Sequence, residues 1–478
     1  MDPLGWPKRR RVFAVAIIMF FAVISLLSLQ CPALMLHALR EEFKHEDMGA
    51  FRFNQLESFP TLLMGVGCVF WIPVSLILGR RPVFLCCTAL YTLGVIWAGV
   101  AGSFHSLLGA VCLLGFCAAP AVSTAILVVI DLTFIHERPR ATAVWFSVGG
   151  AVSLLLLSLS PLIIQLDVQW RQFYHIWIIP STASFFLTFL FFPETYFVRP
   201  LVAYDGHVVF QGAAEKIHIY EEWQHFPPAL LVPEKPRQKA WLVSPKFTMP
   251  TGCSWRQGLA CYLQMLKCTI NPLIFWVLLM NTVNFGGMMS IGATYPVLLS
   301  NPPYNLPPYG VGLVSLAAAV GSFLAWPASS IMIQRTTTRL AARNKGVRHA
   351  EYILPGFILP VLAGAASVFI YAVVAEYHHH FLWVYLAYGL NAFSFSSMST
   401  ANTLWVTEAF PYWAAASLAA VGGVSYIASF GISSALVDWL ALQGYFWVNI
   451  EIGVALVLLG FVGVPIAFWG KSIRQYIH

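Results

Sequence analysis

Long apolar runs separated by short polar turns fill most of the chain. Each run has about the 20 residues that a helix needs to cross the hydrocarbon core of a bilayer. The runs are too long for the strands of about ten residues with alternating polarity that build a membrane β-barrel. The pattern therefore predicts twelve membrane-spanning helices, at residues 12–36, 57–78, 83–103, 107–130, 143–166, 173–193, 272–299, 309–333, 353–375, 381–406, 413–437 and 446–470.

One long polar segment divides this pattern into two halves of six spans. The segment mixes prolines with charges of both signs, and we expect a short surface helix around residues 213–223. Each half has a basic loop after its second span, at residues 79–83 and 335–348. Repeated halves are typical of secondary transporters. The sequence predicts an all-α integral membrane protein with an N-terminal six-helix bundle (1–193), a cytoplasmic central loop (194–271) and a C-terminal six-helix bundle (272–478).

The composition supports this interpretation and orients the chain. Of the 478 residues, 59% are hydrophobic and only 10% are charged. All but four of the 27 lysines and arginines fall on one side of the predicted topology. Because basic loops remain in the cytoplasm, both termini are expected there. The same bias accounts for the net charge of +7, so no nucleic-acid partner is expected.

The sequence gives no sign of a catalytic, nucleotide or metal site. The nearest approach to a phosphate-binding loop, PIAFWGKS at residues 465–472, has proline where that motif requires its first glycine. The run of three histidines at residues 378–380 is expected to be a solvated outer turn. The nine cysteines show no paired zinc spacing. We therefore expect neither an enzyme nor a bound cofactor or metal.

Five segments, in their order along the chain, carry a resemblance to a known family. They are IPVSLILGRRPVFL at 72–85, DLTFIHERPRATAVW at 131–145, WRQFYHIW at 170–177, FFPETY at 191–196 and ARNKGVRHAEYILP at 342–355. With them the chain resembles the major facilitator superfamily, in its fungal branch of drug-proton antiporters and their relatives that carry histidinol, polyamines or other small cations. The resemblance implies two bundles that rock around a central site lined by spans one, four, seven and ten.

Three positions depart from the pattern of that family. The family usually has an acid three residues before Gly79, where this chain has Leu76. Many antiporters have an arginine four residues before a glycine in span four, where this chain has Val111. Ile353 stands where the family has another arginine. Proton coupling through the span-four arginine is therefore excluded.

Charged residues at the inner ends of the spans are the candidates for gating. Arginines there can bind carboxylates or helix carbonyls and hold helix ends together in one conformation. The alternative is that they only fix the topology. The candidate gating residues are Gly79, Arg80, Arg81, Asp131, Arg138 and Arg140.

Uncharged polar side chains near the bilayer midplane are the candidates for substrate binding. They are tolerated there only beside a cavity or another helix. For each one, the alternative is a hydrogen bond to a neighbouring helix. The set is Gln30, Asn281, Asn284, Asn391 and Tyr426, and Glu57 near the outer end of span two is the candidate proton or cation site.

These observations predict a secondary transporter of small organic molecules in the plasma membrane. The resemblance implies export of a drug-like compound or secondary metabolite as the leading interpretation, with protons as the candidate coupling ion. Uptake or facilitated movement of small cations such as polyamines is the alternative. A third interpretation is a membrane sensor that keeps the transporter fold without transporting. We expect a monomer embedded in the bilayer.

Overall fold

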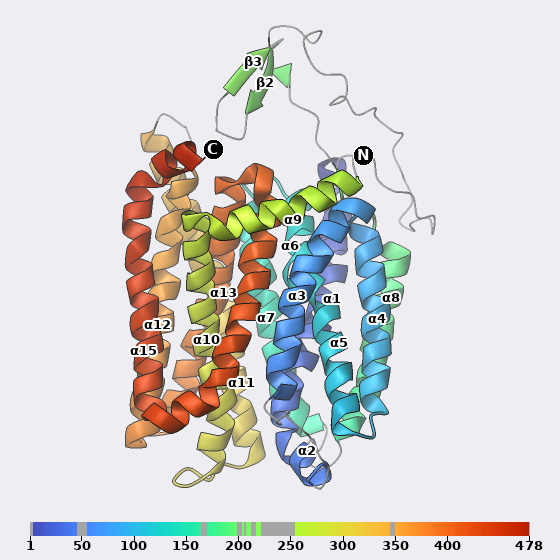
Figure 1. The fold of residues 1–478 in the computed structure, drawn as a ribbon, viewed down its shortest axis with the longest axis vertical. Coiled ribbons are helices and arrows are strands. Elements are labelled where there is room, and N and C mark those ends of the chain that lie inside the picture. The colour runs from blue at the N-terminus through green and yellow to red at the C-terminus, as the bar shows by residue number, and fades with distance from the viewer. Residues whose placement is uncertain are drawn as a thin grey trace.

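The computed structural model describes residues 3–44, 55–163, 170–197, 203–204, 207–211, 217–220, 254–344 and 349–477. Most of these residues form long helices that run side by side between two ends of a bundle (Figure 1). The two described ends of the chain lie at the same end of this bundle (Figure 1). Below, it is called the terminal end.

The described part of the first half contains eight helices, and most of them follow the apolar runs. A tight reversal joins the third to the fourth at Gly79, whose φ of 101° is a conformation that favours glycine. Ser103 begins the fifth helix by accepting the N–H of Ser106. The helices are α1 (Lys8–Leu34), α2 (Leu36–Glu42), α3 (Gln55–Leu78), α4 (Arg80–Gly99), α5 (Phe104–Val122), α6 (Thr124–Leu132), α7 (Arg138–Ile163) and α8 (Trp170–Phe191).

At the end of the central segment, helix α9 (Trp255–Ile270) lies across the terminal end, just before the second half (Figure 1). Asn271 caps the next helix by accepting the N–H of Leu273, and Pro272 occupies its first turn. Gly444, with a φ of 79°, bends the last helix. The helices are α9 (Trp255–Ile270), α10 (Pro272–Ser300), α11 (Pro308–Arg343), α12 (Ile358–Tyr377), α13 (Leu382–Ala409), α14 (Ala414–Ala419) and α15 (Ser425–Ile477), with a π-helical turn at Ala420–Val424 and 3-10 turns at Pro3–Gly5, Ala350–Phe357 and Pro411–Trp413.

In the described part of the central segment, three short strands lie between the two halves in sequence. They are β1 (Ala203–Tyr204), β2 (His207–Gln211) and β3 (Ile217–Tyr220), and they form an antiparallel sheet in the order β1-β2-β3. The prediction of a surface helix around residues 213–223 is therefore wrong at residues 217–220, which form a strand. The sequence IHIY there combines β-branched and aromatic residues, which favour a strand. The other residues of that range lie outside the described part.

Ten helices of the described chain are long and apolar enough to cross a membrane. One of them, Pro411–Arg474, has 64 residues and contains the bend at Gly444. Helix α13 is not among the ten, because serine, asparagine and threonine interrupt its apolar sequence. The number of twelve spans and the cytoplasmic placement of both termini therefore remain predictions.

Among the described residues, α7 packs on α11 and α13 across the two halves, and α3 packs on α15 and on the π-helical turn before it. In the contact with α3 the backbones approach closely at Gly65, because a Cβ there would lie 2.7 Å from the carbonyl oxygen of Gly423. Gly423 belongs to the π-helical turn. Helix α9 packs on α3 and α14 at the terminal end, and Gly258 makes room there for Ile77.

Candidate substrate cavity and its surrounding networks

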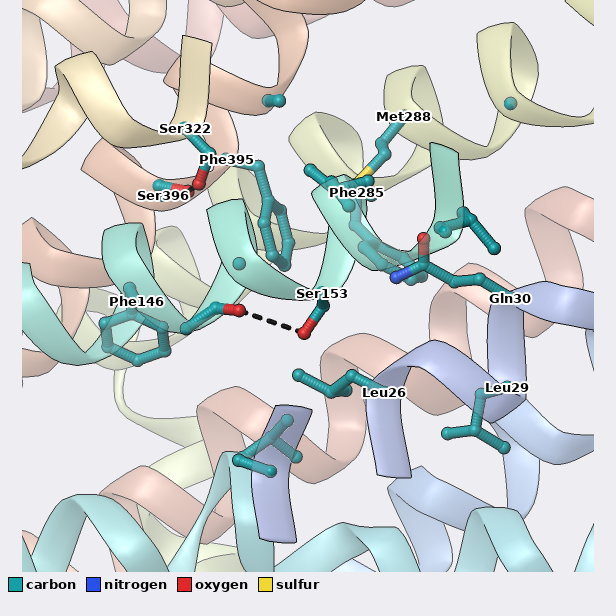
Figure 2. A pocket seen from close by; sticks show the side chains of 18 of the residues that line it. Leu26, Leu29, Gln30, Phe146, Ser153, Phe285, Met288, Ser322, Phe395 and Ser396 are labelled. Carbon is teal, nitrogen blue, oxygen red and sulfur yellow. Dashed lines mark hydrogen bonds between the residues drawn. The ribbon is translucent and has the colours of Figure 1, made fainter. Parts of the chain in front are cut away.

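A cavity of about 170 Å³ lies between the two halves of the bundle. Figure 2 shows side chains that line it from α1, α7, α10, α11 and α13. A water needs roughly 10–15 Å³ measured in this way, so the cavity has room for about a dozen waters or one small organic molecule. It is therefore the candidate substrate site.

The described lining of this cavity carries no ionisable acid or base of the Asp, Glu, Lys, Arg or His type. Aromatic rings and methionines dominate it. Such side chains give large, adaptable apolar contacts and stacking faces. The aromatic and methionine members are Met19, Met64, Trp145, Phe146, Phe285, Met288, Met289, Tyr295, Tyr388, Phe395 and Tyr426.

Three polar side chains of the lining have no hydrogen-bond partner within the described residues. They are Gln30 from α1, Trp145 from α7 and Tyr426 from α15. The serines of the lining differ, because Ser153 donates to Gly149 O at 2.9 Å and Ser322 donates to Ser147 O at 3.0 Å. The amide, indole and phenol are thus available to a bound molecule. Sequence reasoning selected Gln30 and Tyr426, whereas it did not distinguish Trp145 from the many other aromatic residues.

Asn281 lines a second, smaller cavity of about 40 Å³. Its Oδ1 accepts a hydrogen bond from Asn402 Nδ2 at 3.1 Å. Val122, Phe146 and Tyr426 line both this cavity and the larger one. These three side chains therefore lie at the boundary between a mainly apolar space and a space with two asparagines.

Asn284 and Asn391 are not among the described residues that line either cavity. Both are buried, with exposed fractions of 2% and 1%. Ser394 Oγ donates to Asn284 Oδ1 at 2.9 Å and also contacts Pro360 O at 2.7 Å. The Asn284 amide thus links α10 to α13. For Asn284 this agrees with the alternative to substrate binding, a hydrogen bond to a neighbouring helix.

The side chain of Glu57 lies outside the described part of the structure. Its backbone belongs to the first turn of α3. Its suggested role in proton or cation binding therefore remains a prediction.

Arg80 and Arg81 form a network at the terminal end of the first half. Their backbone N–H groups donate to the two carboxylate oxygens of Glu194 at 2.9 and 3.1 Å. A carboxylate at the first turn of α4 accepts hydrogen bonds from N–H groups that have no partner within the helix. Its negative charge is also attracted by the positive end of the helix dipole. Arg80 also binds Ser75 Oγ at 2.6 Å and lies 3.6 Å from a carboxylate oxygen of Asp131. Glu194 was present in the recognised FFPETY segment but was not selected as a site residue.

The two remaining gating candidates differ in exposure. Arg138 is half-buried, whereas Arg140 is exposed and has no ion pair among the described residues. Glu137 instead pairs with Arg11 at 3.5 Å, and Arg11 also donates to Leu132 O at 3.0 Å. Arg11 of the N-terminal basic segment therefore binds the turn between α6 and α7. In the sequence analysis the basic residues of this segment served only to orient the chain.

The second half has its own buried ion pair at the terminal end. Arg474 Nη2 and Nε donate to Glu351 Oε1 at 2.7 and 3.2 Å, and Arg474 Nη1 donates to Ala409 O at 3.1 Å. Exposed fractions are only 3% for Arg474 and 8% for Glu351. The pair joins the 3-10 turn before α12 to the end of α15 and the end of α13. Sequence reasoning missed it, because its partners lie 123 residues apart.

Comparisons with known proteins agree with this architecture. The sequence profile described as Major Facilitator Superfamily matches residues 13–432. An uncharacterized transporter of Schizosaccharomyces pombe is 23% identical over 99% of this chain and 91% of its own length. An efflux pump of Penicillium aethiopicum is 24% identical over 43% of this chain and 41% of its own length. The crystal structure of the human organic anion transporter MFSD10 has a TM-score of 0.58 and 14% identity, over 96% of this chain and all of that one, which indicates a shared fold.

Proposed function

Because the chain belongs to the Major Facilitator Superfamily, a family of membrane transporters and not enzymes, we propose that it exports a neutral, largely apolar small molecule. The observation that carries this proposal is the uncharged, aromatic and methionine-rich lining of the central cavity. Small-molecule sites usually have this composition: apolar side chains bury most of the ligand, and a few polar groups orient it.

The same lining disfavours a polyamine as the substrate. A molecule with several ammonium groups loses its hydration in a low-dielectric cavity, and this costs free energy unless carboxylates replace the water. An aromatic face stabilises one desolvated cation by about 2 kcal/mol, which is less than the cost of removing several ammonium groups from water. A neutral molecule with one or two hydrogen-bonding groups needs only partners such as Gln30, Trp145 and Tyr426.

The direction and orientation of transport complete the proposal. Export is supported by the similarity to an efflux pump of Penicillium aethiopicum, although that match covers less than half of each chain. We place the terminal end in the cytoplasm, following the distribution of basic residues. We also propose the plasma membrane as the location and twelve spans as the topology, in two six-helix bundles formed by residues 1–193 and 272–478. The substrate then moves between the larger cavity and the cytoplasm past Phe146 and Tyr426.

Transport by the purified full chain in vesicles of known orientation tests this proposal. The probes are a labelled neutral aromatic compound, its quaternary ammonium analogue and spermidine. We expect saturable movement of the neutral compound only. The variant Gln30→Leu should raise the KM for a neutral substrate with hydrogen-bonding groups by about 3- to 10-fold, because one neutral hydrogen bond contributes about 0.5–1.5 kcal/mol.

Gln172→Leu is the matched control, because Gln172 is an exposed glutamine of α8 outside the cavity. Its KM should equal that of the unchanged protein. Transport of spermidine in preference to the neutral compound would refute the neutral substrate class and favour the cation carrier. An absence of flux for every probe, with the protein folded, would favour a membrane sensor.

A further inference from the structure

Helix α11 is longer than a membrane crossing requires. Its 36 residues span about 54 Å at 1.5 Å per residue, compared with about 30 Å for a hydrocarbon core. The helix begins at Pro308, opposite the terminal end, and its other end precedes the 3-10 turn that holds Glu351 against Arg474. Its last turns therefore extend into the headgroup region and beyond it at the terminal end.

Three arginines lie along one side of this extension. Arg335, Arg339 and Arg343 are exposed and separated by four residues, so they follow one another on neighbouring turns. Ile333 and Thr337 on the opposite side are buried, and Ile333 packs against Gly356. This packing fixes which side of the helix faces outward.

These arginines have no ion-pair partner in the part of the chain that the structure describes. The sequence from residue 331 to residue 350 contains no aspartate or glutamate. Like charges four residues apart on a helix repel each other. A bound anion would relieve that repulsion and supply the acceptors that guanidinium groups prefer.

A shallow cavity on this face contains two of the three arginines. It is lined by Ile331, Gln334, Arg335, Thr338 and Arg339. Gln334 and Thr338 add uncharged hydrogen-bond donors beside the two guanidinium groups. This combination of donors fits a phosphate group, which accepts several hydrogen bonds at once.

The same side of α11 is apolar within the membrane-spanning part. Val320, Leu324 and Ile331 are 54%, 53% and 45% exposed. They lie four and seven residues apart, on the side of the helix that continues into the cavity with Arg335. A ligand that fills both parts has a phosphate at one end and a hydrocarbon chain at the other.

From this arrangement we propose that the outer side of α11 binds an anionic phospholipid of the cytoplasmic leaflet. Arg335 and Arg339 hold its phosphate, and Val320, Leu324 and Ile331 contact an acyl chain. Basic sites beside spanning helices at the cytoplasmic surface recognise such headgroups. The inference rests on the proposed membrane orientation and not on the transported substrate.

Native mass spectrometry of the purified full chain tests this site without any transport measurement. The probes are phosphatidylserine and phosphatidylinositol phosphate, with phosphatidylcholine as the zwitterionic lipid and inositol phosphate as the soluble headgroup. We expect tighter binding of both anionic lipids than of phosphatidylcholine or inositol phosphate. In the double variant Arg335→Ala, Arg339→Ala this binding should weaken about 25-fold, because each cation near a membrane surface contributes a factor of about five.

The double variant Arg9→Ala, Lys471→Ala is the matched control, since it removes two exposed charges elsewhere at the terminal end. Its lipid binding should stay within twofold of the unchanged protein. Equal weakening in both double variants, or equal binding of phosphatidylcholine, would overturn the site. Inositol phosphate binding as tightly as the lipid would instead assign the arginines to a soluble phosphate. If the double alanine variant does not fold, the double variant Arg335→Gln, Arg339→Gln takes its place, and the same outcomes decide.

Discussion

Individual polar side chains in this protein differ in whether a protein partner satisfies them. An unsatisfied buried polar group costs about 1–3 kcal/mol, so it persists where water or a ligand takes the missing place. Gln30 and Tyr426 face the central cavity without a partner among the described residues, whereas Asn281 and Asn284 accept hydrogen bonds from neighbouring helices. The first pair is therefore suited to binding, and the second pair to holding helices together.

The sequence identified all of these residues but did not separate them. Residue type and depth along a span can be read from a sequence. The face that each span turns toward the cavity depends on how neighbouring helices pack. Glu351 and Glu194 were overlooked for a related reason, since each acquires its role from a partner more than 100 residues away.

The Glu351–Arg474 pair gives a prediction at this scale. Arg474→Ala leaves the buried Glu351 carboxylate without its partner, which costs about 3–5 kcal/mol in comparable buried pairs. We expect a fall of that size in the free energy of unfolding, measured by denaturant unfolding in detergent micelles. Arg256→Ala, which changes an exposed arginine of α9, should have an effect below about 0.5 kcal/mol.

Replacing both members of the pair distinguishes the lost partner from the lost side chain. In Glu351→Leu, Arg474→Met no buried charge remains, so this protein should be more stable than Arg474→Ala. The ion-pair explanation is wrong if the double variant is the less stable of the two.

At the scale of helices, the apolar runs located the elements well. The run at 57–78 lies within α3 (Gln55–Leu78), and all but the first residue of the run at 381–406 lies within α13 (Leu382–Ala409). Periodicity is informative there because each run is long and bounded by polar turns. It gave no sign of α9, which lies across the terminal end, nor of the strand at Ile217–Tyr220, because both fall in the central polar segment, where local patterns are short.

The contact between α3 and α15 gives a prediction at this scale. A methyl group at Gly65 would meet the Gly423 carbonyl oxygen at 2.7 Å, and a backbone atom cannot rotate away. Gly65→Ala should lower the free energy of unfolding by about 1–3 kcal/mol, as overpacking usually does. Thermal unfolding in detergent measures the change.

Gly431→Ala is the control for this substitution. Gly431 also lies in a helix of this contact region, in α15, but no atom lies within 4 Å of its added Cβ. The variant should be neutral or slightly more stable, since alanine favours a helix over glycine. Equal destabilisation by both substitutions would mean that the close approach at Gly65 is not the cause.

The two halves of the molecule meet around the central cavity, and each half has a charged network at the terminal end. Arg80 and Arg81 bind Glu194 in the first half, and Arg474 binds Glu351 in the second. The described cavity lining contains no Asp, Glu, Lys, Arg or His. For a coupling proton, we propose Glu57 in α3.

Gradient-driven flux tests this proposal for the molecule as a whole. If protonation of Glu57 couples transport to a pH gradient, Glu57→Gln should reach the membrane and bind substrate but lose the pH dependence of flux. Glu376→Gln, at an exposed position near the end of α12, should retain it. Unchanged pH dependence in Glu57→Gln would exclude this residue from coupling.

The shared location of the two described chain ends determines whether the number of membrane crossings between them is even or odd. A chain that begins and finishes on one side of a bilayer crosses it an even number of times, however its individual helices are counted. A truncated or spliced form that lacks an odd number of crossings would deliver its new terminus to the opposite compartment. Losses of helices in pairs would preserve sidedness, and single losses would not.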